Sequence, residues 1–368
     1  MTTTDTDVQH IISRFETRGE FHRSEPIHVG HINDTILVRT RSESDPDYVI
    51  QRINHHVFKD VDRLMENILR ITTHIAGKVK SENHDGQKKF VELVRAKNKK
   101  YYYRDQAGNY WRCYVYCRNG SEEHSGVSPL MAYEGGRALG KFQQFLSDLP
   151  GGPLHETIPG FHDLGIRLDD FNRALNADAF NRAQFAVDET DLFITHADEM
   201  LGVYNLIREG TFPLRVTHND TKFNNILFDE HANALCIIDL DTVMNGYVLY
   251  DFGDAIRTLT NTTHEDDPDT SRVGFDFELY EEFAKGYVLE TMKLLTANEI
   301  KYLAFSAKFM TYMIALRFLT DYLEGDVYYK TDHENHNLER TRNQLALLKK
   351  MDAEYGRMAG VIENLSGD

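Results

Sequence analysis

The apolar residues of this 368-residue chain follow two patterns, and the change between them falls near residue 118. Before that point, short runs rich in β-branched and aromatic residues are separated by turn residues, which predicts strands. The predicted strands are "EPIHV", "DTILVRT", "YVIQRI", "KKFVELV", "KKYYYRD" and "NYWRCYVYC". One stretch, "FKDVDRLMENILRITTHIAG", has an apolar period near 3.6 residues and predicts a helix after the third strand.

Beyond residue 129 the helical period dominates. The predicted helices cover residues 129–148, 167–177, 187–209, 275–293, 297–324 and 336–363. Strand signal there is confined to "LRVTH", "NILFD" and "ALCIID". We therefore expect an α+β chain in two lobes: a small antiparallel sheet with one helix over residues 1–117, and a larger, mainly helical lobe over residues 118–368. The hinge between them is expected near residues 116–119.

Composition narrows the classes of partner. The formal net charge of -17 repels nucleic acid and anionic membranes, so we expect neither as a partner. No stretch approaches the roughly 18 apolar residues of a membrane span, and the first residues lack an apolar leader, which favours the cytoplasm. Cys113, Cys117 and Cys236 are expected to be buried and reduced, since none has a CxxC spacing. The sequence carries no signal for an oligomeric state, and a monomer is compatible with it.

Two short motifs resemble phosphate-binding or phosphatase motifs, but the residues around them do not fit the folds that those motifs require. "GGRALGK", Gly135 to Lys141, has P-loop spacing, but Phe142 replaces the required Ser or Thr, and the apolar period predicts an amphipathic helix instead. "CIIDLDTV" resembles the nucleophile motif of haloacid-dehalogenase-type phosphatases. That motif opens a sheet of alternating strands and helices, whereas the residues after 243 are almost wholly helical, so the phosphatase stays a less favoured alternative.

The stretch "VTHNDTKFNNILFD" carries the strongest chemical signal, with His218, Asp220, Lys222 and Asn225 in a loop over residues 217–225. Phosphoryl transfer needs a carboxylate at the attacking hydroxyl, a cation near the phosphate oxygens, and oxygen ligands for a metal ion. We assign these roles to Asp220, Lys222 and Asn225 in that order, and a structural role to His218. A plain polar turn between strands is the alternative, and it leaves four suitably placed residue types unexplained.

The chain also contains Asp251-Phe252-Gly253, the three letters that hold magnesium in protein kinases. In kinases, however, the metal-binding aspartate follows the catalytic asparagine after one strand, a turn and a second strand. Asp239 fits that spacing, and Asp241 is a weaker second candidate. We therefore expect Asn225 and Asp239 to bind Mg²⁺, with Asp251 capping a helix or hydrogen-bonding the catalytic loop.

The small lobe then acquires nucleotide-binding roles. "HVGHINDTILV" is expected to form a phosphate-covering turn in which Gly30, His31 and Asn33 face ATP. On the third strand, alternation favours Arg52 as the cation for the α- and β-phosphates, with Gln51 as the alternative if the register slips by one residue.

Three further sites complete the predicted cleft. Glu66, on the following helix, is available as the acidic partner of the third-strand cation, although an exposed helical glutamate is the simpler interpretation. The backbone at Tyr116 and Cys117 is expected to hydrogen-bond adenine. On the 297–324 helix, Arg317 and Asp321 are spaced for an ordinary ion pair or, alternatively, for binding sugar hydroxyls.

The acidic loop over residues 261–271 is expected to be solvated.

With these motifs in view, the chain resembles the aminoglycoside and choline phosphotransferase superfamily, which has the protein-kinase-like fold, and within it the bacterial N-acetylhexosamine 1-kinases. The matching stretches are "GHIN", "YVIQRIN", "HETIPGFHD", "RVTHNDTKFNNIL", "IIDLDTV", "DFGDAIR", "RFLTDYLEGDVYY" and "HNLERTRNQ". The resemblance implies transfer of the ATP γ-phosphate to the anomeric hydroxyl of N-acetylglucosamine or N-acetylgalactosamine with Mg²⁺, in cytoplasmic sugar salvage. It also implies that His31, Arg317 and Tyr328 face the sugar. An aminoglycoside, choline or homoserine is the alternative acceptor.

Overall fold

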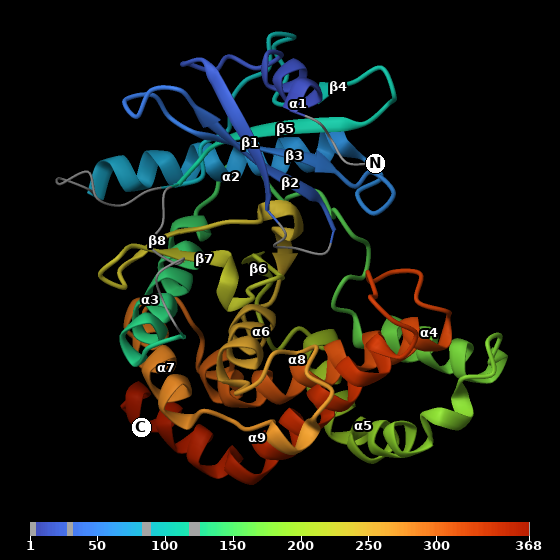
Figure 1. Cartoon of the computed structure of the whole chain (residues 1–368). Coiled ribbons are helices and arrows are strands. Elements are labelled where there is room, and N and C mark those ends of the chain that lie inside the picture. Colours follow the sequence, from blue (N-terminus) through green and yellow to red (C-terminus); the bar gives the residue numbers. More distant parts are fainter. Residues whose placement is uncertain (1–4, 28–31, 83–89, 118–125, 368) are drawn as a thin grey trace.

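The N-terminal region folds into one antiparallel sheet in the computed structural model, which describes residues 5–27, 32–82, 90–117 and 126–367. The strand order is β1-β2-β3-β5-β4. The strands are β1 (Phe21–Ile27), β2 (Asp34–Thr40), β3 (Tyr48–Ile53), β4 (Tyr103–Arg104) and β5 (Tyr110–Val115). The predicted small antiparallel sheet is thus confirmed, and the helix α2 (Val61–Glu82) follows directly after the third strand (Figure 1).

The strands predicted for "KKFVELV" and "KKYYYRD" are much shorter in the structure than their sequence pattern indicated. One edge of β5 pairs with β3 along its whole length, so only the other edge is available to them. There, β4 pairs with the first residues of β5, while Leu93 makes an isolated bridge to Tyr114 near its end. Because the two segments share a single strand edge, neither can extend further.

The sheet is covered on one face by a helix that the apolar pattern did not reveal, α1 (Asp5–Ile12). Val8, Ile11 and Phe15 pack with Ile50 and Cys113 into a separate small core. The helix has only eight residues, too few for its period to be recognised against its polar neighbours. Helix α2 instead joins the large core that continues into the helical region.

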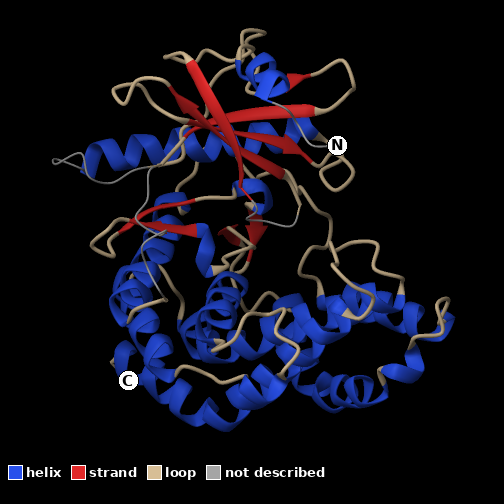
Figure 2. Cartoon of the chain, viewed as in Figure 1, coloured by secondary structure: helices blue, strands red, loops and turns tan. Residues whose placement is uncertain are grey.

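The C-terminal region is helical, and Figure 2 shows its helices below the sheet, with short strands between. Its helices are α3 (Pro129–Leu146), α4 (Leu164–Ala177), α5 (Val187–Arg208), α6 (Val248–Thr260), α7 (Phe277–Thr291), α8 (Ala297–Leu323) and α9 (His336–Ser366). Two antiparallel strand pairs are present, β6 (Arg215–Thr217) with β9 (Met244–Gly246), and β7 (Ile226–Phe228) with β8 (Ala234–Ile237). Within the described ranges every sheet is antiparallel, which removes the doubly wound sheet that the phosphatase alternative requires.

The motif with P-loop spacing lies inside α3, where its small residues allow close helix packing. A Cβ atom on Gly136 would lie 2.1 Å from the carbonyl oxygen of Phe283, and one on Gly286 would lie 2.0 Å from that of Tyr133. Both glycines therefore have no room for a side chain where α3 crosses α7. The prediction of an amphipathic packing helix is confirmed.

Helix α8 is the central helix of the C-terminal region. By length and composition alone it could cross a membrane, contrary to our expectation that no stretch comes close. However, 94% of its most apolar 18-residue window is buried inside the fold. A helix that is apolar on all sides because it is surrounded by other helices explains both observations.

We expected the acidic loop over residues 261–271 to be solvated, but several of its carboxylates have partners inside the fold. Asp266 accepts hydrogen bonds from His336 Nε2 (2.9 Å) and Arg340 Nε (2.5 Å), both on α9. Glu265 pairs with the buried Arg257 of α6 at 3.0 Å. The carboxylates of this loop therefore join α6 to the C-terminal helix.

Candidate active site

The catalytic loop connects β6 to a single turn of 3-10 helix, η3 (Phe223–Asn225), which leads into β7. The side chains of Asp220 and Lys222 are 28% and 29% exposed, and Lys222 Nζ lies 3.9 Å from Asp220 Oδ1. The negative charge of Asp220 raises the pKa of Lys222, so the lysine remains cationic at neutral pH. The loop thus presents one carboxylate and one ammonium group together, as the sequence predicted.

His218 has the structural role that we expected. Its Nε2 donates to the carbonyl oxygen of Ile238 at 2.9 Å, and its Nδ1 accepts from the backbone N–H of Asp220 at 3.3 Å. The acceptor role of Nδ1 requires the proton to be on Nε2. The ring therefore ties the catalytic loop to the segment that carries Asp239.

Asp251 supports the catalytic loop through hydrogen bonds from the loop backbone. It is fully buried in α6, where Oδ1 accepts from the backbone N–H of Asn219 (2.7 Å) and Oδ2 from that of His218 (3.0 Å). Gln143 Nε2 donates to the same Oδ2 at 2.8 Å. These three donors use the carboxylate fully, which confirms the predicted hydrogen bonds to the catalytic loop.

Asn225 and Asp239 are held together by backbone pairing. The N–H of Ile238 donates to the carbonyl oxygen of Asn225 at 2.9 Å, which places Asp239 directly after that contact. Asn225 Nδ2 donates to the carbonyl oxygen of Asp220 at 2.9 Å, so its side-chain oxygen is directed away from that bond. Within the described ranges, neither this oxygen nor the Asp239 carboxylate takes part in a hydrogen bond or ion pair.

The electrostatics of this position fit a divalent cation. Burial, together with the charges of Asp241 and Asp220, raises the pKa of Asp239 to about 7. Amide and carboxylate oxygens are the ligands that hard divalent cations prefer, and a bound cation would offset the repulsion among the three carboxylates. Asp239 also has a left-handed backbone (φ 60°, ψ 60°), which costs energy and is typical of functional positions.

Asp241, our second candidate for the metal, has other partners. It is 2% exposed and forms a bidentate ion pair with Arg112 of β5. Asn33 Nδ2 also donates to its Oδ2 at 2.7 Å. Because both of its oxygens are occupied, the prediction of Asp241 as a metal ligand is not supported.

The third-strand cation is the clearest departure from the sequence prediction. Arg52 is 46% exposed and pairs with Asp34 on the neighbouring strand, whose carboxylate also lies 3.8 Å from Lys330 of the C-terminal region. Gln51, the alternative, faces the interior, where its Oε1 accepts from Arg112 Nε at 2.9 Å. The buried cation at this position is therefore Arg112 of β5, which the sequence analysis did not single out.

Other predicted nucleotide contacts are only partly described. Gly30 and His31 lie outside the described residues, so their roles in binding ATP and sugar stay predictions. The N–H of Tyr116 donates to the carbonyl oxygen of Asp47 at 2.8 Å, so this N–H is already used, and the adenine contacts of Tyr116 and Cys117 stay predictions. The lobe boundary also stays a prediction, because residues 118–125 are not described.

Glu66 is not brought to a cation of the sheet. Its side chain is 58% exposed and pairs with His155 at 3.0 Å. The neighbouring Asn67 is fully buried and donates to the carbonyl oxygen of His155 at 2.7 Å. Glu66 and Asn67 therefore both contact His155 of the C-terminal region, and Glu66 is not the partner of a cation on the sheet.

Arg317 of α8 lies among aromatic rings beside the catalytic loop. Its guanidinium carbon is 4.7 Å from the ring centre of Phe161, 5.5 Å from that of Tyr328 and 5.7 Å from that of Tyr329. Burial lowers the pKa of Arg317, but the two tyrosines and Asp220 together raise it. Among the described residues no carboxylate pairs with this arginine, so its N–H donors are available to a ligand.

The expected ion pair between Arg317 and Asp321 does not form. Asp321 accepts instead from the backbone N–H groups of Val327 (2.9 Å), Tyr328 (2.7 Å) and Tyr329 (3.0 Å). The carboxylate therefore fixes the loop that carries both tyrosines. Arg317 and Tyr328 are brought together as predicted, and Asp321 is a positioning residue that sequence spacing misassigned.

Two further residues shape this side of the cleft. His162 is 5% exposed, and its Nε2 donates to the carbonyl oxygen of Asn219 at 2.7 Å. Burial and the nearby charge of Arg317 lower the pKa of His162 to about 3, so the ring is neutral. Arg167 donates to the carbonyl oxygen of Gly160 at 2.9 Å, and burial and the charge of Arg317 lower its pKa. Two arginines therefore lie close together here, and Arg167 also pairs with Asp170 at 3.2 Å.

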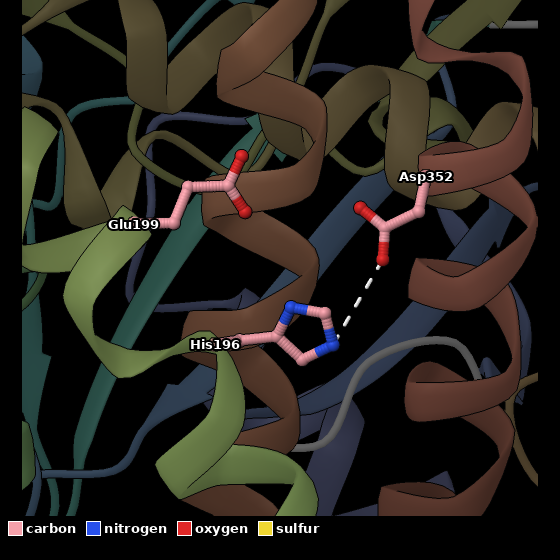
Figure 3. Close-up of side chains that lie close together, drawn as sticks. All are labelled: His196, Glu199 and Asp352. Carbon is pink, nitrogen blue, oxygen red and sulfur yellow. Dashed lines mark ion pairs between the residues drawn. The ribbon is translucent and has the colours of Figure 1, made fainter.

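A second group of potential metal ligands lies on α5 and α9, far along the chain from the catalytic loop. Figure 3 shows His196, Glu199 and Asp352 facing one another, with His196 Nε2 3.8 Å from Asp352. The ammonium group of Lys308 already bridges the carboxylates, at 2.7 Å from Glu199 and 2.8 Å from Asp352. These contacts explain the cluster as an internal ion pair.

Comparison with known proteins agrees with this arrangement. Residues 23–287 match the model of the phosphotransferase enzyme family, APH. The structure is similar to the microcompartment-associated aminopropanol kinase, with a TM-score of 0.64 and 14% identity over 96% of this chain and 98% of that one. It is also similar to an aminoglycoside phosphotransferase from Alicyclobacillus acidocaldarius, with a TM-score of 0.60 and 12% identity over 97% and 96% of the two chains.

A third similar structure is spectinomycin phosphotransferase APH(9)-Ia in complex with ADP and spectinomycin, with a TM-score of 0.58 and 11% identity over 96% and 99% of the two chains. At such identities the likeness shows the fold alone. The family match, by contrast, covers the sheet, the catalytic loop and the segment with Asp239. The chain therefore belongs to the APH phosphotransferase family and is a small-molecule phosphotransferase with a protein-kinase-like fold.

Proposed function

We propose that this phosphotransferase transfers the γ-phosphate of ATP to the anomeric hydroxyl of N-acetylglucosamine or N-acetylgalactosamine, in the cytoplasm. The observation that carries the proposal is Arg317, which lies among three aromatic rings and close enough to Asp220 for their charges to interact. Aromatic faces pack against the apolar faces of a sugar ring, and guanidinium N–H groups donate to its hydroxyl and carbonyl oxygens. The sequence resemblance to N-acetylhexosamine 1-kinases supports the same acceptor.

Each step of the transfer has a residue in the described site. Asp220 accepts the proton of the anomeric hydroxyl as its oxygen attacks the γ-phosphorus, and the bond from phosphorus to the β,γ-bridging oxygen breaks to release ADP. Lys222 remains cationic beside Asp220 and offsets charge on the phosphoryl group in transit. Asn225 and Asp239 would hold Mg²⁺, which supplies positive charge to the phosphates when bound.

The charge of the acceptor region argues against a polycationic substrate. Arg317 lies close enough to lower the pKa of Arg167, and although Arg167 pairs with Asp170 at 3.2 Å, no described carboxylate pairs with Arg317. An aminoglycoside or choline would have to place its cation beside them, and like charges at short range cost several kcal/mol when desolvated. The net charge of -17 attracts cations at long range and so favours a cationic acceptor. Cationic alcohols and homoserine therefore stay the second candidates.

The direct test is ATP-dependent ADP release with a panel of acceptors. We expect turnover with N-acetylglucosamine and N-acetylgalactosamine, and at least about tenfold lower kcat/KM with choline, homoserine and kanamycin. Arg317→Met keeps an unbranched apolar chain while removing the guanidinium donors, and should raise the sugar KM with little change in the ATP KM. Efficient turnover of kanamycin or choline, with none of either sugar, would overturn the proposal. Release of inorganic phosphate from an added phosphate monoester, in the absence of ATP, would instead support a phosphatase.

A further inference from the structure

Arg112 is the buried cation at the boundary between the sheet and the C-terminal region. It is 0% exposed, and it pairs through both terminal nitrogens with Asp241, which lies in the 3-10 turn η4 (Leu240–Thr242). The Nη2 to Oδ2 distance is 2.9 Å, and the two side chains are 1% and 3% exposed. A two-point contact of this kind fixes both distance and orientation.

The remaining N–H groups of the guanidinium are directed to the sheet. Gln51 Oε1 accepts from Arg112 Nε at 2.9 Å and from Nη2 at 2.8 Å, and Gln51 Nε2 donates to Thr35 Oγ1 at 3.0 Å. Gln51 of β3, which is itself hydrogen-bonded to Thr35 of β2, therefore orients the guanidinium that pairs with Asp241. At most one of its five N–H donors lacks a partner in these contacts, so Arg112 is poorly available to a phosphate oxygen.

Asp241 also contacts the start of β2. Its Oδ2 accepts from Asn33 Nδ2 at 2.7 Å, while Asn33 Oδ1 accepts from the backbone N–H of Asn54 at 3.0 Å. Asn33 comes a few residues after Gly30 in the segment predicted to cover the phosphates. One carboxylate thus joins β5, through Arg112, and Asn33, just before β2, to the C-terminal region.

The same turn carries the predicted metal ligand. Asp239 lies two residues before Asp241 and has a left-handed backbone, and Thr242 Oγ1 donates to the carbonyl oxygen of His218 at 2.8 Å. The turn is therefore fixed on one side to the sheet and on the other to the catalytic loop. A displacement of Asp241 would move the Asp239 carboxylate with it.

Stability alone does not account for this pair. Removing two charges from water costs several kcal/mol, and replacing a buried ion pair by apolar side chains is often neutral or stabilising. A contact that orients two lobes is a better reason to retain it, since small displacements at a phosphoryl-transfer site cost large factors in rate.

We propose that Arg112 and Asp241 act as a positioning pair, which sets the Asp239 carboxylate against the nucleotide-facing side of the sheet. This inference rests on the proposed function, because it takes Asp239 as the ligand of the nucleotide-bound metal. This role differs from the one predicted for the third-strand cation, which we expected to contact the α- and β-phosphates. It is not a catalytic pair, since neither side chain reaches the reacting atoms.

The test measures nucleotide binding by calorimetry and needs no acceptor. The probe is the non-hydrolysable ATP analogue AMP-PNP, with Mg²⁺ or with EDTA, and each protein is also melted. Arg112→Lys keeps the charge but cannot make the two-point contact. The double variant Arg112→Met/Asp241→Leu removes both charges together. Lys308→Met is the matched control, because it removes another buried cation between two carboxylates outside the cleft.

We expect both Arg112 variants to bind Mg·AMP-PNP at least about tenfold more weakly, a loss of about 1.4 kcal/mol or more. Binding with EDTA should change less than about twofold, because the nucleotide alone does not need Asp239. Lys308→Met should lower the melting temperature and leave both dissociation constants unchanged.

Other results would overturn the proposal. If the Arg112 variants resemble Lys308→Met, with lower melting temperatures and unchanged binding, the pair only stabilises the fold. If binding weakens equally with Mg²⁺ and with EDTA, the whole cleft is perturbed and Asp239 is not specifically positioned. If the wild-type chain binds no Mg·AMP-PNP at all, the proposed function fails, and this inference fails with it.

Discussion

Replacing Asp239 or Asp251 by asparagine should distinguish the proposed metal ligand from the residue that supports the catalytic loop. Asp251→Asn replaces a fully buried carboxylate that accepts from Asn219, His218 and Gln143. An amide offers one acceptor atom, so its NH₂ group must face one of these donors. A hydrogen bond to a charged group contributes about 1.5 to 3 kcal/mol, and an unsatisfied buried donor costs about 1 to 3 kcal/mol.

Burial raises the pKa of Asp251, so removing its charge recovers part of that loss. We therefore expect a net destabilisation of about 2 to 4 kcal/mol. An unfolding entropy of about 2.1 cal/mol/K per residue, over 368 residues, converts this into a melting temperature about 3 to 5 °C lower. Turnover of the folded Asp251→Asn protein at 25 °C should stay within about tenfold of wild type, because no reacting group is lost.

Asp239→Asn should have the opposite profile. Without metal, no described hydrogen bond or ion pair is lost, and a carboxylate whose pKa is raised to about 7 becomes neutral. The folded protein holds a proton there between pH 3.8 and 7 that the unfolded chain releases, so wild type loses stability as the pH rises through that window. Above pH 7 the variant should therefore be more stable by roughly 1 to 2 kcal/mol after allowance for partial exposure.

Activity gives the decisive contrast. Asp239→Asn should lower Mg²⁺-dependent kcat at least about a hundredfold to a thousandfold, because it removes charge from the metal and the developing phosphate charge. Both variants are melted in EDTA from pH 5.5 to 8 and assayed for ADP release. Loss of turnover in Asp251→Asn with an unchanged melting temperature, combined with activity in Asp239→Asn, would refute this placement of the metal site.

Three further perturbations have distinct expected outcomes. Asp220→Asn should reduce kcat by at least about a thousandfold, with the AMP-PNP dissociation constant within about threefold of wild type; a parallel loss of nucleotide binding contradicts its role as base. His162→Gln should reduce the loss of stability on acidification from pH 6.5 toward 3, because the unfolded chain binds a proton that the neutral buried ring, with its pKa lowered to about 3, refuses; equal pH slopes in both proteins contradict this. Gly136→Ala should lower the melting temperature by several degrees without altering either KM, since its Cβ would lie 2.1 Å from the Phe283 carbonyl oxygen; an unchanged melting temperature contradicts the close crossing of α3 and α7.

Local sequence patterns were sufficient for most of the architecture and for the catalytic loop. The spacing from Asn225 to Asp239 predicted which aspartate lies beside Asn225, because a strand, a turn and a strand have nearly fixed length; the backbone pairing of Ile238 with Asn225 bears out that proximity, and the metal-binding role stays a prediction. The fold places Asp251 under the loop backbone, as its position near a helix start suggested. Helix periods likewise gave α3 and α8, since their apolar faces are long.

The wrong sequence predictions share a physical cause. Contacts between residues that lie far apart in the chain leave no pattern in the local sequence. Arg52 and Arg112 are both strand arginines, and only the register between β3 and β5 decides which one faces the cleft. Asp321 is spaced for a helical ion pair with Arg317, yet three backbone N–H groups in the following loop hold it more tightly. A period or motif cannot reveal such partners.

The most direct test of the central claim is the identity of the product. The wild-type chain and Asp220→Asn are incubated with ATP, Mg²⁺ and N-acetylglucosamine, and the phosphorus and proton NMR spectra are recorded. The account predicts a new phosphorus signal coupled to the anomeric proton in the wild-type reaction, and none with Asp220→Asn. A phosphate coupled to another sugar position, or an equal product signal from both proteins, would contradict it.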